Sequence, residues 1–188
     1  MSRIPELKRE ELNEAQSRVY DAVMASRGNI SGPFRIWLHS PEFSDRAQRL
    51  GEFARYRTTL GPRLSELAIL VTARFWDCQV EWSLHEPFAR QGGLDDGVIA
   101  AVRDRRAPAF QAEDERAVYG FCTELLAKRF VRDETFNVVV SHVGAQGAVE
   151  LTGLVGYYSL VAMTLNAFEV PLPGGATPLM ADCPTFRP

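Results

Sequence analysis

Cysteine is scarce in this sequence, and its three positions lie far apart. Cys78, Cys122 and Cys183 form an odd set without paired spacing. A disulfide framework in a small secreted domain needs an even set of cysteines at regular spacings. The distribution therefore argues against a disulfide-stapled domain, and we expect the chain in the reducing cytoplasm.

Long apolar runs and an excess of one charge are also missing. The first residues, MSRIPELKREEL, lack the apolar core of a signal peptide. The most apolar segment, Leu151 to Val170, is interrupted by Gly153, Gly156 and Asn166, whereas a spanning helix needs about 20 consecutive apolar residues. The formal net charge of -3 gives no reason to expect an anionic surface as partner. We therefore expect neither a membrane nor a nucleic acid as partner.

Histidine, the commonest metal ligand, occurs only three times, at His39, His85 and His142. No HExxH motif is present, and only His85 lies near a cluster of acidic residues. We expect no metal and no cofactor.

The sequence does contain helical periodicity along most of its length. Its 188 residues, 46% apolar and 24% charged, fit one globular domain. Apolar residues recur at the spacing of helices, and no run of alternating strands is seen. We predict an all-α fold with a single domain over 1–188, a core of about 15–170, a charged arm at 1–12 and a proline-rich tail at 171–188. The predicted helices cover 13–28, 41–57, 62–75, 80–91, 95–102, 112–129, 133–143 and 148–168.

One stretch, ELAILVTARFWDCQVEWSLH, places five chemically active groups among apolar residues: Glu66, Arg74, Cys78, Glu81 and His85. The last three follow at i, i+3 and i+7 and would share one face of a helix. On one straight helix, Glu66 would point about 120° away from Cys78. It can join the others only if the helix breaks between them, as the region of Asp77 permits.

These groups allow more than one interpretation. Glu81 can hold the His85 ring in one tautomer and favour its protonated form, or the two form a surface salt bridge. Cys78 is a nucleophile, a redox thiol or a small core residue. Arg74 can pair with Glu66, bind a substrate carboxylate or reach solvent.

Two further arginines, Arg57 and Arg63, are similar candidates for binding an anionic substrate. The sequence does not choose between them and Arg74.

The pattern resembles the carboxymuconolactone decarboxylase family, which includes the alkylhydroperoxidase D-like (AhpD-like) proteins. The residues that carry the resemblance are Glu66, Cys78, Glu81, Trp82, His85, Ala89 and Gly92, with the upstream segments GPF, WLHSPEF and PRLSELAILVTARFW. Peroxidase members carry Glu…Cys-x-x-Cys-x-x-x-His. Here Glu66, Cys78 and His85 match, but Glu81 stands at the second cysteine, and Glu81-Trp82 with His85 is similar to decarboxylase-like members.

The resemblance implies an AhpD-like helical bundle, cofactor-free acid–base chemistry and assembly into homo-trimers or hexamers. We therefore expect a carboxy-lyase or isomerase acting on a small anionic lactone or cyclic acid, in aromatic catabolism. Glu66, Glu81 and His85 would be catalytic, and Arg74, Cys78 and Trp82 would contact substrate. The alternatives are a thiol-dependent peroxidase using Cys78, and a non-catalytic oligomeric protein whose charged cluster is sealed from solvent without an adjacent pocket.

Overall fold

The protein is helical throughout the part that its computed structural model describes, residues 2–174, 176, 178 and 179, with no strand among them. The elements in chain order are the 3-10 helix η1 (Arg9–Glu11), α1 (Glu14–Arg27), α2 (Phe34–Trp37), α3 (Pro41–Tyr56), α4 (Gly61–Phe75), α5 (Gln79–Gln91), α6 (Asp96–Arg103), α7 (Glu113–Lys128) and α8 (Asp133–Ala167). The predicted all-α class is confirmed. Residues 175, 177 and 180–188 of the predicted tail lie outside the described residues.

Local sequence signals account for several helix ends. The Asn13 side chain accepts a hydrogen bond from the backbone of Gln16, whose side chain in turn accepts from the backbone of Asn13, so that α1 begins with a capping box. Gly28 ends the same helix in the left-handed conformation. A proline occupies the first turn of α3 and of α4, where no backbone donor is lost.

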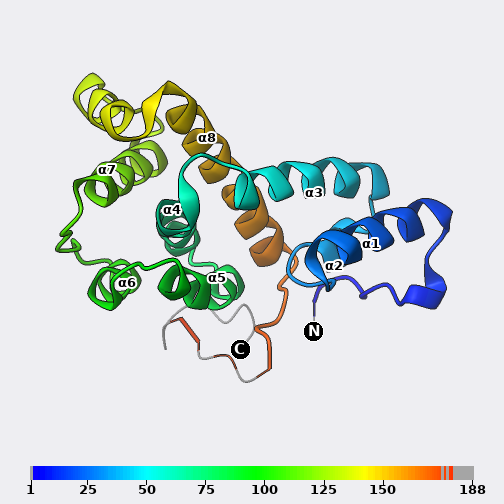
Figure 1. The fold of residues 1–188 in the computed structure, drawn as a ribbon. Helices are drawn as coiled ribbons and strands as arrows, with labels where there is room; N and C mark the ends of the chain where they lie inside the picture. Colours follow the sequence, from blue (N-terminus) through cyan, green and yellow to red (C-terminus); the bar gives the residue numbers. More distant parts are fainter. Residues whose placement is uncertain (1, 175, 177, 180–188) are drawn as a thin grey trace.

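Helix α4 is the centre of the molecule. Every residue from Leu64 to Arg74 is buried, and α4 packs against α5, α7 and α8. In Figure 1, α1 to α3 lie on one side of α4 and α5, while α6 and α7 lie on the other. The N-terminal helices are joined to α8 by Trp37, whose indole nitrogen donates to the Thr164 hydroxyl over 3.0 Å.

The chain breaks between α4 and α5, as the sequence predicted. Trp76, Asp77 and Cys78 separate the two helices, and Asp77 adopts a positive φ of 50°. Aspartate tolerates this left-handed conformation better than most residues. Its carboxylate also accepts hydrogen bonds from Arg105 and from Arg74. The break therefore turns the chain so that α5 can return along α4.

In the C-terminal half, the helices predicted at 133–143 and 148–168 correspond to two helical segments of α8 that meet at a kink. Gly144 departs from helical geometry at this kink, with φ 71° and ψ 175°. The first segment begins at Asp133, and Arg132 occupies the cap position.

Helix α8 was compared in length and composition with a membrane-spanning helix. Within the described residues, it is the one helix long and apolar enough to cross a membrane by length and composition. However, 61% of its most apolar window is buried inside the molecule, as in the core helix of a globular protein.

The conformation of Gly144 generates a stability prediction. Its φ and ψ lie in a region that is nearly restricted to glycine, so Gly144→Ala should destabilise the protein by about 1–3 kcal/mol. Gly156→Ala is the matched control, because Gly156 is exposed in regular α8 with open space around it, and alanine there should be neutral or stabilising. Urea unfolding measures both. Equal stability of the two variants would contradict the prediction.

Candidate active site

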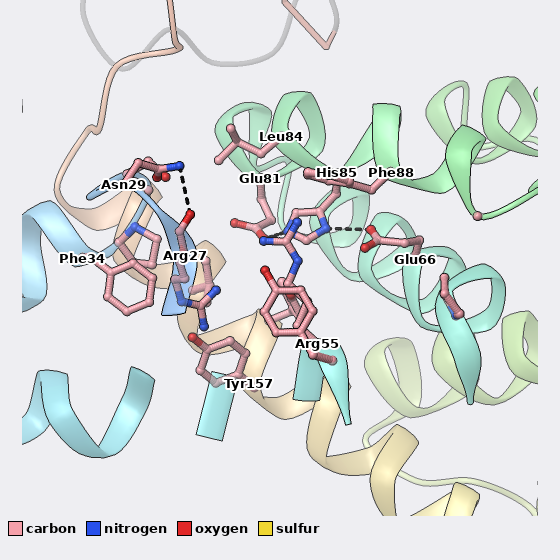
Figure 2. A pocket seen from close by; sticks show the side chains of 18 of the residues that line it. Arg27, Asn29, Phe34, Arg55, Glu66, Glu81, Leu84, His85, Phe88 and Tyr157 are labelled. Carbon is pink, nitrogen blue, oxygen red and sulfur yellow. Dashed lines mark hydrogen bonds and ion pairs between the residues drawn. The ribbon is translucent and has the colours of Figure 1, made fainter. Parts of the chain in front are cut away.

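The three acid–base candidates of the sequence meet at the packing surface of α4 and α5. His85 Nδ1 lies 2.7 Å from Glu66 Oε2, and His85 Nε2 lies 3.0 Å from Glu81 Oε1. Glu66 comes from α4, while Glu81 and His85 stand one turn apart on α5. All three side chains are buried. We call this group the Glu66–His85–Glu81 cluster, and Figure 2 shows the imidazole between the two carboxylates.

The cluster exists because the chain breaks after α4. Glu66 and His85 are 19 residues apart and could not meet on one straight helix. The turn at Asp77 places the Glu81–His85 face of α5 against the face of α4 that carries Glu66.

The electrostatics of the cluster favour an imidazolium. Burial is the largest single influence on His85 and opposes its charge, but the charges and hydrogen bonds of Glu81 and Glu66 together outweigh it. They raise the pKa of His85 to about 9. His85 is therefore protonated at neutral pH.

Aromatic rings restrict the approach of water to the imidazole. The Tyr158 ring meets it edge-on with centroids 5.1 Å apart, and the Phe88 ring lies at 6.1 Å. Burial raises the pKa of Tyr158 well above its usual value, so its hydroxyl keeps its proton. A weakly hydrated surrounding of this kind strengthens charge–charge interactions within the cluster.

A cavity of about 660 Å³ adjoins the cluster, and Glu66, Glu81 and His85 all line it. Its apolar lining includes Phe34, Leu84, Phe88, Tyr158 and Val161. This is the size of a pocket for a small organic molecule. The cluster is therefore accessible from a pocket, which the sealed, non-catalytic interpretation did not expect.

Two arginines in the cavity lining were missed by the sequence analysis. Arg27 comes from the last turn of α1, and Arg55 from the last turn of α3. The Arg55 guanidinium lies over the Phe88 ring, 4.5 Å from its centroid. Neither arginine is near the cluster in sequence. The GPF segment, which contributes to the family resemblance, also lines the cavity. It is the one motif of the N-terminal helical region that the sequence analysis named and that contributes to the site.

The arginines that the sequence proposed are engaged elsewhere. Arg74 donates from Nε to the carbonyl of Arg103 over 2.6 Å and pairs with Asp77. Arg63 pairs with Asp114 and Glu115. Arg57 pairs with Glu52. None of these three arginines lines the cavity, so their placement does not support a role in binding substrate there.

Trp82 and Cys78, the other predicted substrate contacts, also lie outside the cavity lining. The Trp82 indole donates to Glu86 over 2.9 Å and is almost completely buried. Cys78 is 0% exposed and occupies the cap position before α5. Their positions suit packing at the α4–α5 junction.

Among the described residues, one further cysteine remains, and it does not line the cavity. Cys122 is buried on α7, and burial raises the pKa of its thiol. Cys183 lies outside the described residues. Glu81 occupies the position at which the peroxidase pattern has its second cysteine, and its carboxylate contacts His85.

No metal-binding group of three or more His, Cys, Asp or Glu side chains is found within the part of the chain that the structure describes. The other two histidines are both exposed, and His39 Nε2 lies 2.9 Å from the carbonyl of Pro5.

Comparisons with known proteins agree with this geometry. The model of the carboxymuconolactone decarboxylase family matches residues 41–124, which include the whole cluster. No curated protein matches the chain.

Several solved structures share the fold. A peroxidase-related protein with an alkylhydroperoxidase AhpD core from Ralstonia eutropha is 17% identical, with a TM-score of 0.74 over 92% of this chain and 93% of that one. An AhpD-related protein from Agrobacterium tumefaciens is 20% identical, with a TM-score of 0.66 over 76% of this chain and 99% of that one. A cysteine-to-alanine variant of the debrominase Bmp8, in complex with 2,3,4-tribromopyrrole, is 13% identical, with a TM-score of 0.72 over 93% of this chain and 95% of that one.

The electrostatics of the cluster predict how His85 titrates. An NMR titration should give a pKa near 9 for its ring, and Glu81→Gln should lower that pKa, because the burial that opposes the charge then meets only one carboxylate. Glu42→Gln, which removes an exposed carboxylate on α3, is the control and should leave the pKa unchanged. His85→Gln assigns the resonance. A pKa at or below 6.5 in the unaltered protein would contradict the prediction.

The same pKa predicts how stability depends on pH. The folded-state pKa lies above the unfolded value, so the stabilisation from His85 is complete below about pH 6.5 and declines as the pH rises toward 9. The loss should amount to a few kcal/mol in urea unfolding. His85→Gln should lack this component of the pH dependence.

Proposed function

We propose that the chain is a cofactor-independent acid–base enzyme of the carboxymuconolactone decarboxylase family, whose model matches residues 41–124, with an AhpD-like fold. Its reaction is the decarboxylation or isomerisation of a small anionic lactone or cyclic acid. The observation that carries this proposal is a buried imidazole between two carboxylates in the wall of a cavity of about 660 Å³.

The cluster suits movement of a proton to and from carbon. Both nitrogens of His85 contact a carboxylate oxygen, while the described residues offer no hydrogen-bond partner to the second oxygen of Glu66 or of Glu81. The proton therefore reaches substrate through one of these carboxylates, and the imidazolium supplies it. Glu81 orients the ring and raises its pKa, and Glu66 is the second proton-transfer group.

In decarboxylation, the bond between the ring carbon and the carboxylate carbon breaks, and CO2 leaves. The electron pair stays on the ring carbon, which takes a proton from the cluster, and the cluster regains a proton from water. In isomerisation, a carboxylate removes a proton from one carbon, and the cluster returns a proton to another. Both reactions need an acid and a base close together, as the cluster provides.

The shape of the cavity supports a ring-type substrate. Aromatic and aliphatic side chains line it, and the cluster and two arginines supply its charges. Bmp8, which has the same fold, was solved with 2,3,4-tribromopyrrole, so a pocket in this fold can hold a small substituted ring. Peroxide reduction receives less support, because Cys78 is buried outside the cavity and Glu81 replaces a second thiol.

Turnover tests the proposal. A panel of small lactones and ring carboxylic acids in D2O should show CO2 release or deuterium incorporation at carbon. His85→Gln and Glu81→Gln should each lower the rate by about 10²- to 10⁴-fold. His39→Gln and Cys78→Ser are the controls and should retain the rate. Full turnover in both His85→Gln and Glu81→Gln would refute the acid–base role, and peroxide consumption abolished by Cys78→Ser would favour the thiol peroxidase.

We also propose that the protein is a homo-oligomer. An apolar groove between α3 and α8 is lined by Leu50, Phe53 and Val149, and Val149 is 73% exposed. Sedimentation should give a multiple of the 21.0 kDa chain mass, and Val149→Glu should reduce it. A monomer at micromolar concentration would contradict this.

A further inference from the structure

Arg27 has an unusual environment for a guanidinium. Arg27 is half-buried, and its Nε and Nη2 are buried with no hydrogen-bond partner among the described residues. The guanidinium lies over the Phe34 ring, 4.8 Å from its centroid, and lines the same cavity as the cluster. Burying two guanidinium nitrogens without a hydrogen-bond partner is costly, so an anion is expected at this position.

A second donor converges on the same place. A Cβ at position 51 would overlap the Tyr157 hydroxyl oxygen and would lie 3.0 Å from Arg27 Nη2, so both groups approach the bare backbone of Gly51. Within the described residues, the Tyr157 hydroxyl has no hydrogen-bond partner, and burial raises its pKa, so it keeps a proton to donate. Figure 2 shows Arg27 and Tyr157 on one side of the pocket and His85 with Glu66 on the other.

The charges of the cavity orient an anionic ligand. Arg27 and Arg55 line the cavity and supply positive charge that attracts an anion. Apolar side chains, including Phe34, Leu84 and Phe88, also line this cavity. A ring acid fits this arrangement when its carboxylate faces Arg27 and its ring extends toward His85.

We propose that Arg27 and Tyr157 form a carboxylate subsite that holds a spectator carboxylate of the substrate. The inference rests on the proposed function for the identity of the substrate, a ring acid, but the subsite itself is defined by binding. The planar guanidinium of Arg27 donates two parallel hydrogen bonds to the carboxylate, and the Tyr157 hydroxyl donates a third. Arg55 supplies a second positive charge without a carboxylate partner among the described residues.

Benzoate binding tests the subsite without requiring turnover. Benzoate is titrated into the full chain at constant ionic strength, and the side-chain Nε–H resonance of Arg27 and the thermal midpoint are followed. In the unaltered protein, benzoate should shift the resonance and raise the midpoint. Arg27→Gln should weaken benzoate binding by roughly tenfold to a hundredfold. Arg27→Lys, which keeps the charge but loses the planar guanidinium, should fall between the two.

The matched control is Arg18→Gln. It removes the same charge from the same helix, but Arg18 is exposed and pairs with Glu14. Benzoate binding should be unchanged in this variant. Benzamide, the neutral counterpart of benzoate, should bind equally to the unaltered protein and to Arg27→Gln.

Loss of folding is not expected to obscure the result. Because two buried nitrogens of Arg27 have no partner within the described part of the chain, Arg27→Gln should be as stable as the unaltered protein or more stable. No benzoate binding by the unaltered protein, or equal binding by Arg27→Gln and Arg18→Gln, would overturn the subsite. His85→Gln should still bind benzoate, so that failure of the acid–base proposal and failure of the subsite are distinguished.

Discussion

A buried imidazole held between two carboxylates is the interaction on which the rest of the site depends. Removing a histidine from water disfavours its charged form, and one carboxylate only partly compensates for that cost. Glu66 from α4 and Glu81 from α5 together reverse the balance, so that His85 is a cation inside the protein. The arrangement forces α4 and α5 to pack closely. It also makes the break at Asp77 a requirement for the site rather than a neutral loop.

The junction between α4 and α5 is stabilised by charge as well as by packing. Asp77 in its left-handed conformation accepts from Arg74 and Arg105, and Arg74 also reaches the carbonyl of Arg103 at the end of α6. Arg74, which the sequence offered as a substrate-binding residue, therefore helps to fix the angle between α4 and α5. The substrate-facing charges come instead from α1 and α3, so the N-terminal helices complete a pocket whose cluster is built by α4 and α5.

Sequence reasoning succeeded where the governing signals are local. Asn13, Gly28, Pro41 and Pro62 mark helix ends by capping and backbone geometry, and Glu81 and His85 share a face because they are one turn apart. The meeting of Glu66 with His85 was predictable only as a condition, namely that the helix breaks between them. Arg27 could not be found in this way. Nothing near it in sequence indicates that α1 packs beside α5 across a cavity, and that placement is decided by tertiary contacts such as Trp37 with Thr164.

The tight approach at Gly51 has a consequence for sequence comparison. The backbone there leaves room for the Tyr157 hydroxyl only because no side chain is present. In a relative with alanine at the equivalent of position 51, the ring at the equivalent of position 157 would have to move, because the added Cβ would lie 2.4 Å from its Cζ as well as 2.1 Å from its hydroxyl oxygen, and the pocket would lose one donor at this place. Glycine and tyrosine at these two positions therefore form a pair that can be read from sequence. Its presence separates relatives that can place a tyrosine hydroxyl in the carboxylate subsite from relatives that cannot.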